Sequence, residues 1–449
     1  MERLGGQQTG ETQSIRQVVA ASFIGTTIEW YDFFLYGSAA ALIFGQLFFP
    51  YADPLVGTLA SFGIYGVGFV VRPVGGIIFG HYGDRIGRKT MLVISLMMMG
   101  ISTFFIGLLP TADTIGIWAP VLLVVLRTFQ GLGVGGEWGG AVLLAVEHSP
   151  EGRRGFYGSW AQMGVPAGLL LSNGVLFPLA SLLPQEEFFA WGWRVPFLAS
   201  IVLVGVGLFI RLRILETPVF RRVQETHTEA QMPIVDVVRY YPKNILLALG
   251  MRLAQNTNFI ILTVFVLSYV TQQLGLPQTT ALLGVIIAAV VSIFTTLGFG
   301  ALSDSLGRRR VYMFGAVFSL IFFAAPFFWL MDTATPVLIW LAIALGLALG
   351  HDPMYGPQAA YFSELFGTRL RYSGASIGYQ LGAVVTGVAP LIATSLLAWT
   401  GGHWWLIAVY MVLLSLITIV ATYLASETYE EDITAERPEE RQAIAGEPT

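Results

Sequence analysis

Long apolar segments recur along almost the whole chain, and no other feature of the sequence limits the possible folds so strongly. A helix that crosses a bilayer needs about 20 mainly apolar residues. Hydrophobic residues make up 55% of the chain and charged residues only 12%, whereas about 25% of the residues in ordinary soluble domains are charged. The sequence therefore predicts an all-α integral membrane protein with twelve transmembrane helices. The predicted spans lie near 18–46, 55–80, 91–109, 118–147, 155–183, 191–210, 245–271, 279–302, 311–331, 336–363, 374–398 and 404–424.

A polar stretch divides these segments into two sets of six. It is the longest polar run inside the chain and includes Arg221, Arg222 and Glu225. We therefore expect two pseudo-symmetric six-helix bundles joined by a linker and followed by a polar tail. The predicted ranges are 1–210 for the N-terminal bundle, 211–243 for the linker, 244–425 for the C-terminal bundle and 426–449 for the tail.

The distribution of basic residues predicts how the chain is oriented. Positive side chains in short loops stay preferentially on the cytoplasmic side. Of the 24 Lys and Arg residues, three fall inside spans and only Arg194 falls on one side, which leaves 20 on the side that holds the termini and the linker. Both termini are therefore expected in the cytoplasm. The net charge of −4 is small and the basic residues form no stripe, so we expect no nucleic-acid partner.

The loops after the second and eighth segments repeat one another. Residues 79–89 read FGHYGDRIGRK and residues 299–309 read FGALSDSLGRR, at a constant offset of 220. A second repeat follows the fourth and tenth segments, where Glu147 precedes Arg154, and Glu364 precedes Arg371, by the same seven residues. Duplicated halves are typical of secondary transporters, which place their substrate site between the halves near the middle of the bilayer.

The first of these loops resembles the signature loop of the major facilitator superfamily, through the pattern Gly-x-x-x-Asp-Arg-x-Gly-Arg-Lys at 80–89. Other segments resemble the metabolite:proton symporter family, whose members take up shikimate, 2-oxoglutarate, citrate, or proline and betaine. The resemblance covers roughly residues 18–425. It implies a monomeric carrier in a bacterial inner membrane that moves a small solute with protons and uses no cofactor or metal. The matching segments are EWYDF (29–33), RPVGG (72–76), QG to GGEWG (130–139) and WGWRVP (191–196).

Ionisable residues inside the apolar segments are the candidate site. Such a residue at the centre of a span costs about 2.5–3.5 kcal/mol, so it is expected to face a cavity or a partner. In the first segment Glu29 and Asp32 are three residues apart, which places them on one helical face. The repeat also matches a base with an acid, because Arg252 precedes Asp304 by 52 residues, as Asp32 precedes Asp84. The predicted substrate site comprises Arg72, Arg127, Arg252, Asn256, His351, Asp352 and Tyr355, with Trp30, Gln162 and Tyr379 as further lining residues.

Asp32 and Arg127 also resemble the proton-coupling pair of the sugar-porter branch of the superfamily, and Glu29 completes the predicted proton-coupling group. Burial favours the protonated carboxyl while a nearby guanidinium opposes it, so the proton affinity depends on which partner the arginine serves. We hypothesise that protonation of Asp32 frees Arg127 or Arg72 to bind a substrate carboxylate. Arg252 and His351 are expected to complete the anion site from the other half.

A structural alternative applies to several of these residues. Buried acid–arginine pairs often only hold helices together, and Glu29 and Glu137 fit that interpretation. Arg72 is then expected to brace the second segment against the fourth through Glu137. His351 is then an interhelical hydrogen-bonding residue that does not titrate. Aromatic residues in spans, such as Trp30, more often pack or anchor at the membrane interface.

The charged residues at the ends of the repeated segments form a predicted gate. The superfamily resemblance implies a cytoplasmic charge network that holds the two halves together and breaks as the carrier opens inward. The alternative is that its arginines only fix the topology. The predicted gate comprises Asp84, Arg85, Arg88, Glu147, Arg154, Asp304, Arg308, Glu364 and Arg371.

Three classes of function compete for this sequence. The first is proton-driven uptake of an organic acid, with shikimate-like hydroxy acids favoured because the first and fourth segments resemble that branch. The second is a betaine or proline carrier, whose osmosensing members have a long C-terminal coiled coil, whereas the tail at 426–449 has no heptad run. The third is a membrane enzyme or receptor built on the same scaffold, which we do not expect because the chain has no cysteine and shows no nucleophile triad, metal-ligand cluster or appended soluble domain. A uniporter or exchanger without proton coupling stays open.

Overall fold

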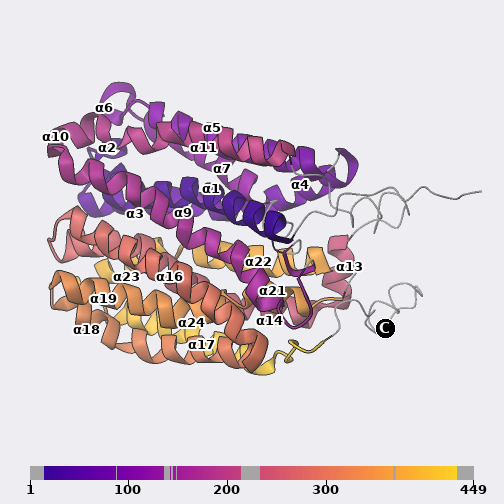
Figure 1. Ribbon diagram of the computed structural model, residues 1–449. Coiled ribbons are helices and arrows are strands. Elements are labelled where there is room, and N and C mark those ends of the chain that lie inside the picture. The colour runs from indigo at the N-terminus through magenta and orange to yellow at the C-terminus, as the bar shows by residue number, and fades with distance from the viewer. Residues whose placement is uncertain are drawn as a thin grey trace, which may run out of the picture.

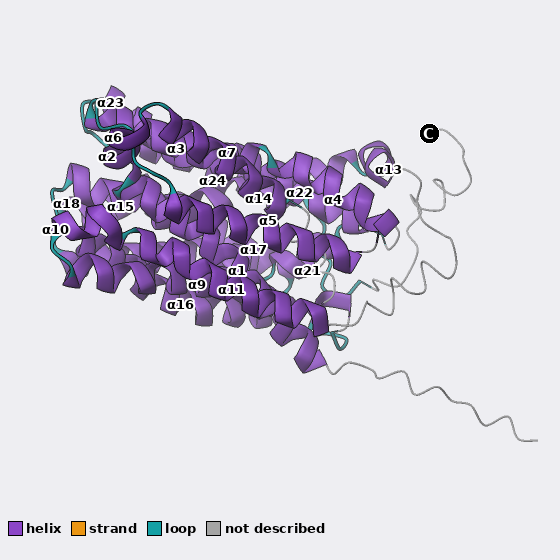
Figure 2. Ribbon diagram, turned by 90° about the horizontal axis from the view of Figure 1, so that it is seen from above, coloured by secondary structure: helices purple, strands orange, loops and turns teal. Residues whose placement is uncertain are grey.

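Helices supply all the regular structure in the part of the chain that the structure describes. The computed structural model describes residues 15–86, 88–135, 142, 145–147, 149–213, 233–367 and 371–431. Its long helices run side by side along one direction, and the loops gather at the two ends of the bundle (Figure 2). The indigo-to-magenta helices of the first half form one group, and the orange-to-yellow helices of the second half form another beneath it (Figure 1).

The first half contains seven long helices in its described residues. The start of α3 shows how the sequence fixes such an element, because Asp53 accepts a hydrogen bond from the backbone N–H of Leu55 at 2.9 Å and Pro54 occupies the first helical position. Both are favourable helix-start signals. The elements are α1 (Ile15–Leu42), α2 (Phe44–Phe48), α3 (Pro54–Val70), α4 (Arg72–Ile86), α5 (Arg88–Leu108), α6 (Ala112–Ile115), α7 (Trp118–Val134), α9 (Arg154–Leu182), α10 (Gln185–Glu187), η1 (Phe188–Gly192) and α11 (Arg194–Arg213).

The second half is more broken along its helices. Short π-helical stretches, labelled η, interrupt two of its spans, and such stretches are frequent at functional sites. The elements are α13 (Pro233–Tyr240), α14 (Pro242–Ile260), η2 (Ile261–Phe265), α15 (Val266–Ser268), η3 (Tyr269–Gln273), α16 (Gln278–Leu306), α17 (Arg308–Ala324), α18 (Pro326–Asp332), α19 (Pro336–Leu345), η4 (Gly346–His351), α20 (Asp352–Tyr355), α21 (Gln358–Glu364), α22 (Arg371–Gly387), α23 (Ala389–Trp399) and α24 (Trp405–Leu424).

The described helices coincide with the predicted spans. Eight of them are long and apolar enough to cross a membrane, and nine are if α17 and α18, which meet at a 46° bend, count as one span. Two shorter apolar helices, Val93–Leu108 and Trp118–Val134, lie where the third and fourth spans were predicted. The all-α membrane fold is therefore confirmed, while the total of twelve spans and the cytoplasmic termini stay predictions.

Close packing of small residues joins the two halves. A Cβ atom added to Gly300 of α16 would lie 2.5 Å from the Ser159 side chain of α9, and one added to Gly155 of α9 would meet Ser303 of α16 at the same distance. Small residues let helix backbones approach closely inside a membrane, where packing replaces the hydrophobic effect. The α9–α16 contact therefore fixes one side of the interface in which the candidate site lies.

The span at 242–273 lies at the centre of the molecule. Of its most apolar window 94% is buried, compared with 33–61% for the other helices that qualify as spans. It carries Arg252, Gln255 and Asn256 on α14, all of them buried. Polar side chains at this depth cannot reach water, so they must find partners inside the protein.

Candidate functional site

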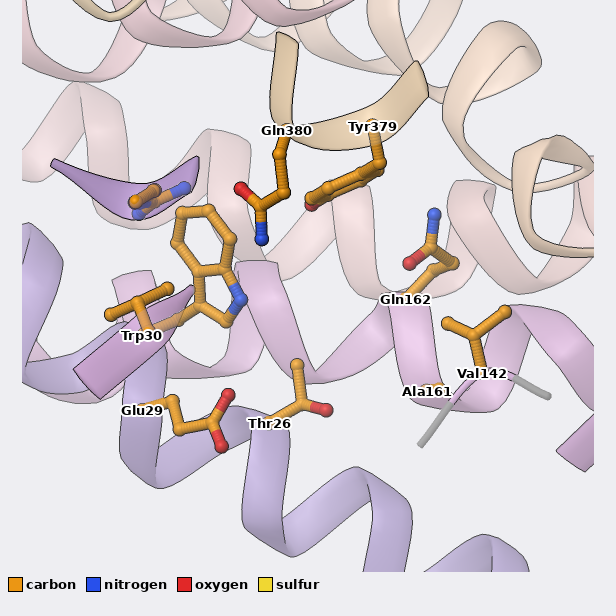
Figure 3. A pocket seen from close by; sticks show the side chains of 10 residues that line it. Thr26, Glu29, Trp30, Val142, Ala161, Gln162, Tyr379 and Gln380 are labelled. Carbon is orange, nitrogen blue, oxygen red and sulfur yellow. The ribbon is translucent and has the colours of Figure 1, made fainter. Parts of the chain in front are cut away.

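A small cavity between the two halves brings together five of the predicted site residues. Its volume is about 10 Å³, roughly the space that one water molecule needs. Trp30 and Glu29 reach it from α1, and Tyr379 reaches it from the facing half (Figure 3). A solute of several carbon atoms therefore requires the halves to separate. The lining residues are Thr26, Glu29, Trp30, Arg72, Val134, Val142, Ala161, Gln162, Tyr379 and Gln380.

Arg72 is the lining residue with the most unusual environment. It begins α4 directly after the turn at Val71, and its side chain is fully buried. None of its three guanidinium nitrogens has a hydrogen-bonding partner among the described residues. Its charge instead lies against aromatic faces, 4.4 Å from the ring centres of Phe33 and Phe69 and 5.3 Å from that of Trp30. Cation–π contacts stabilise a desolvated guanidinium, yet they leave its N–H groups available to an anion.

Arg127 also contacts the Phe33 ring. Its guanidinium is 4.1 Å from that ring centre and 4.3 Å from the ring of Tyr36. It donates to the carbonyl oxygen of Tyr65 at 3.2 Å and to the side-chain oxygen of Gln130 at 3.1 Å. Two buried guanidinium groups thus contact a single ring.

Asp32 reaches Arg127 through intermediates. No ion pair within 4.0 Å joins the two among the described residues. The Gln130 amide donates to the Thr103 hydroxyl at 2.7 Å, and Thr103 in turn interacts with the Asp32 carboxyl. The predicted partners are therefore connected in the order Asp32, Thr103, Gln130, Arg127, all of them buried.

Arg252 of the second half is hydrogen-bonded through two of its three guanidinium nitrogens. It donates to the side-chain oxygens of Gln358 at 3.1 Å and of Gln255 and Asn256 at 3.5 Å each. Its guanidinium lies 3.3 Å from the centre of the Tyr379 ring. Tyr379 lines the cavity, so this ring stands between Arg252 and the space where a solute would bind.

His351 and Asp352 form a buried pair behind this arginine. The Nδ1 atom of His351 is 2.8 Å from an oxygen of Asp352, and its Nε2 atom is 2.7 Å from the amide nitrogen of Gln255. Asp352 also accepts the Ser292 hydroxyl at 2.8 Å and contacts Thr295 of the same helix. The side chains of the pair thus engage neighbours within the second half.

Arg127 does not line the cavity, and the structure separates the other predicted substrate residues into two groups. One group lines the cavity, and the other lies behind it in the second half. Tyr355 connects the two, because its carbonyl oxygen accepts a hydrogen bond from Gln162 of α9 at 3.3 Å. Glu137, the alternative partner of Arg72, lies outside the described residues. The residues behind the cavity are Arg252, Asn256, His351, Asp352 and Tyr355.

The predicted gate residues meet at the end of the bundle that carries the chain termini. Arg308 is 2.7 Å from Asp304 and 3.2 Å from Glu364. Glu364 is also 3.8 Å from Arg154 of the first half, and Arg371 is 3.5 Å from Glu147. The side chains of Asp84, Arg85 and Arg88 lie outside the part of the chain that the structure describes.

Asp304 ties the halves together directly. Its two carboxylate oxygens accept hydrogen bonds from the backbone N–H groups of Gly155 and Phe156, at 2.8 and 2.9 Å. These groups belong to the first turn of α9, where unsatisfied N–H groups and the helix dipole favour an anion. Asp304 of the second half therefore caps a helix of the first half.

Comparison with known proteins identifies the family. The model of the Major Facilitator Superfamily matches residues 22–379 and 247–447. The chain belongs to the Major Facilitator Superfamily. The shikimate transporter of Escherichia coli strain K12 is 42% identical over 418 residues, which cover 92% of this chain and 95% of that protein. The inner membrane metabolite transport protein YhjE of the same strain is 39% identical over 434 residues, covering 95% and 98%.

More distant relatives and solved structures agree with this placement. The proline/betaine transporter of E. coli strain K12 is 32% identical over 94% of this chain and 86% of that protein. A crystal structure of the D-xylose-proton symporter matches with a TM-score of 0.69 over 95% of this chain and 99% of that one. At 17% identity that likeness shows the fold alone. This superfamily member is a transporter, and not an enzyme, in the bacterial inner membrane.

The two halves of this superfamily member are also bridged at the end opposite the termini. Thr58 of α3 and Gln272 of η3 exchange hydrogen bonds at 3.0 and 3.3 Å. A superficial pocket of about 330 Å³ lies beside them, with Leu55, Tyr269 and Gly402 among its lining residues. Bridges at both ends, together with the small central cavity, describe a transporter closed on both sides.

Several residues of the network were missed by sequence reasoning. Thr103 and Gln130 stand in apolar segments, and buried hydroxyl and amide groups there are a signal for interhelical bonding. Glu427 accepts from the backbone N–H groups of Arg308 and Arg309 at 2.8 and 3.1 Å, so it caps α17. Thr428 donates to Glu364 at 2.7 Å. The sequence offered no signal for these last two contacts, because the segment was assigned to a polar tail.

Proposed function

We propose that this protein takes up a small hydroxylated carboxylic acid, of the chemical class of shikimate, together with a proton by alternating access. The observation that carries the proposal is Arg72, a fully buried guanidinium on the cavity wall whose nitrogens have no hydrogen-bonding partner in the part of the chain that the structure describes. A relative that shares 42% identity is named a shikimate transporter. The proposal requires only a solute, a proton and a bilayer, and we expect the monomer to be the working unit.

The chemistry of the cavity suits an organic anion that also carries hydroxyl groups. A carboxylate accepts two parallel N–H groups of a guanidinium, which is a strong and directional arrangement. Gln162 and Tyr379 supply amide and phenol groups beside Arg72, and Trp30 supplies an apolar face. Binding of the anion satisfies the buried cation, so the solute itself stabilises the closed state around the cavity.

Asp32 is the proposed proton carrier. Thr103 and Gln130 connect it to Arg127, and the Phe33 ring contacts both Arg127 and Arg72. Protonation of Asp32 removes the negative charge at the start of this chain of contacts, so that the two guanidinium groups attract the substrate carboxylate more strongly. This electrostatic dependence between proton and solute is the coupling that a symporter needs.

Movement of the two halves exposes the cavity to one side at a time. We place the terminus-bearing end in the cytoplasm because 20 of the 24 basic residues fall on that side. Inward opening then breaks the Asp304 cap of α9 and the Arg154–Glu364 contact. Outward opening breaks the Thr58–Gln272 bridge. Each bridge is small enough to be lost when the solute contacts change.

Transport in liposomes tests the proposal. The purified protein is reconstituted, and uptake of labelled shikimate, 2-oxoglutarate, citrate and betaine is measured with and without an inward proton gradient. Accumulation of one carboxylic acid above its external concentration, only with the gradient, is the expected result. Equilibration that ignores the gradient contradicts proton coupling and favours a uniporter or exchanger.

One feature of the cavity keeps betaine or proline as the second candidate. Glu29 and Trp30 line it together with Arg72, and an acid with an aromatic ring suits the cationic end of a zwitterion. Relatives at 31–33% identity are named transporters of such solutes. Accumulation of betaine in preference to the acids in the same liposomes would select this function.

A further inference from the structure

We propose that His351 is a second proton-binding site of the transport cycle, and that its protonation turns the Gln255 amide away from Arg252, which then loses one of its three amide acceptors. The inference rests on the proposed proton-coupled uptake but concerns the second half of the molecule, where no proton carrier has been assigned. It is carried by the direction of the hydrogen bonds between Arg252 and Asp352, which allows only one protonation state of the imidazole.

The direction of this chain of hydrogen bonds is fixed at Arg252. A guanidinium can only donate, so the Gln358 oxygen, 3.1 Å away, accepts and the Gln358 amide nitrogen must point away. That nitrogen donates to the Gln255 oxygen at 3.1 Å. Arg252 also donates to the same oxygen at 3.5 Å. Both glutamine amides are therefore held in a single orientation.

The orientation of the two glutamine amides determines which ring nitrogen of His351 carries the proton. The Gln255 amide nitrogen donates to Nε2 of His351 at 2.7 Å, so Nε2 carries no proton. Nδ1 then carries it and donates to Asp352 at 2.8 Å. The network thus selects neutral His351 in one tautomer, which is set by the bond that the other ring nitrogen makes.

A second proton on His351 is incompatible with this direction of the hydrogen bonds. It binds at Nε2, where the resulting N–H group would point at the N–H group of Gln255. The chain cannot reverse to accommodate it, because Arg252 at its far end cannot accept a hydrogen bond. The new imidazolium pairs with Asp352, and the Gln255 amide must turn away, which removes an acceptor from Arg252.

The imidazole itself cannot move aside. Its ring lies between Phe259 and Tyr355, with centre-to-centre distances of 4.7 and 4.8 Å, and 1% of it is exposed. The packed elements contribute few titratable groups: α19 has none, and the side chains of α16 beside Asp352 are the hydroxyls of Ser292 and Thr295. The titratable and charged groups around the site are Asp352 and Tyr355 on α20, Arg252 on α14, and Tyr312 of α17, which accepts from Gln358.

Arg252 carries the effect to the solute. Its guanidinium lies over the Tyr379 ring at 3.3 Å, and Tyr379 lines the cavity. A change in the partners of Arg252 therefore changes the position or charge that Tyr379 presents to the cavity. Protonation in the second half and solute binding between the halves are linked in this way.

The protonation state of His351 can be measured directly. The chain has five histidines, so a variant with His81, His148, His227 and His403 changed to Asn leaves only His351. With ¹⁵N-labelled histidine in nanodiscs, NMR is expected to show the neutral Nδ1–H tautomer at neutral pH and protonation of Nε2 on acidification. The Nε2–H tautomer, or an imidazole that stays neutral throughout the pH range of transport, overturns the proposal.

Transport by His351→Asn provides the second test, with His403→Asn as the matched control outside the network. With a gradient of one pH unit, each coupled proton changes the accumulation ratio about tenfold. The ratio for His351→Asn is expected to fall about tenfold while solute exchange continues. An unchanged ratio overturns the second site but leaves the proposed symport standing. If the unmodified protein does not accumulate solute at all, it is the proposed function that fails, and NMR still reports on His351.

Discussion

Arg72 and Arg252 are both almost completely buried, yet the two halves of the molecule offer them different hydrogen-bond acceptors. Arg252 donates to three amide side chains of its own half. Arg72 donates to no described group and is covered by aromatic rings. A buried cation without an acceptor is costly, so the first half retains a charge that a solute anion can satisfy. In the second half, the charge of Arg252 is already hydrogen-bonded to side chains of the protein.

The hydrogen-bonded network that includes Arg127 and the one that includes Arg252 also differ in the group that meets the titrating side chain. The first-half network ends at the Thr103 hydroxyl, which also lies 3.0 Å from the Met99 carbonyl oxygen. A hydroxyl can donate or accept, so Thr103 can adjust to either protonation state of Asp32. The second-half network ends at an imidazole between two rings and cannot adjust. Protonation of Asp32 in the first half is therefore expected to act through the change in charge. Protonation of His351 in the second half is expected to act by breaking hydrogen bonds.

The largest expected effect is on the KM for the acid, and it distinguishes Arg72 from Arg252. Arg72→Gln removes the proposed anion partner, and a buried charge-assisted contact contributes about 2–5 kcal/mol, so the KM for the acid is expected to rise at least about 30-fold. Arg252→Gln is the matched variant and should change KM much less, because Arg252 does not line the cavity. Initial uptake rates over a concentration series give both values. Equal losses of affinity in the two variants would contradict the different roles assigned to Arg72 and Arg252.

Asp32→Asn is expected to abolish the response to the proton gradient. An amide cannot take up a proton, so the accumulation ratio should fall about tenfold for each proton that Asp32 carries across a gradient of one pH unit. Exchange of internal for external solute should continue, since Arg72 is untouched. Accumulation and counterflow measured on the same liposomes distinguish these steps. Concentrative uptake at the unmodified level contradicts the assigned role.

Thr103 tests whether the adjustable hydroxyl matters. Thr103→Val leaves the Gln130 amide without its acceptor, at a cost of about 1–3 kcal/mol for a buried polar group. A fall in proton-driven uptake is expected, while Thr103→Ser retains the hydroxyl and should stay near the unmodified rate. Ser102→Ala is the control, because among the described residues Ser102 donates to the Met98 carbonyl of its own helix alone. Identical behaviour of the valine and serine variants would exclude the relay.

The smallest expected effect concerns the terminus-bearing end. Glu427→Gln weakens the cap of α17, for which a loss of about 0.5–2 kcal/mol is typical when a capping side chain is removed. The thermal unfolding midpoint in detergent should fall by a few degrees. Glu430→Gln is the control, because Glu430 hydrogen-bonds its neighbour Tyr429 and, among the described residues, forms no ion pair with a gate residue. A fall of the same size in both variants would indicate a general effect of tail charge.

The fold could be predicted because its signals are local. Apolar length along 18–46 and the later segments indicates membrane helices without knowledge of their neighbours, and the all-α membrane fold is confirmed. The repeat at 79–89 and 299–309 indicated the superfamily, which the comparisons establish. The site could be predicted in part, since Glu29, Trp30, Arg72, Gln162 and Tyr379 do meet at the cavity. Their roles in binding and proton coupling stay proposals.

Other features of the site depend on contacts between distant parts of the chain. No sequence pattern shows that Gln130 of α7 lies between Arg127 and Thr103 of α5. Nor does a pattern show that Glu427 returns to the start of α17, because the rotation of one helix against another depends on side-chain packing over its whole length.

By itself the sequence determined that the chain folds in a membrane, that it repeats, and that a few charges must lie where lipid would not tolerate them. These are consequences of solvation, which each segment experiences alone. Only the tertiary structure decided which of those charges acquire partners. Among the described residues Arg252 meets three acceptors and Arg72 meets none, because a hydrogen bond requires two groups to meet within about 3 Å, and the packed helices alone set that distance.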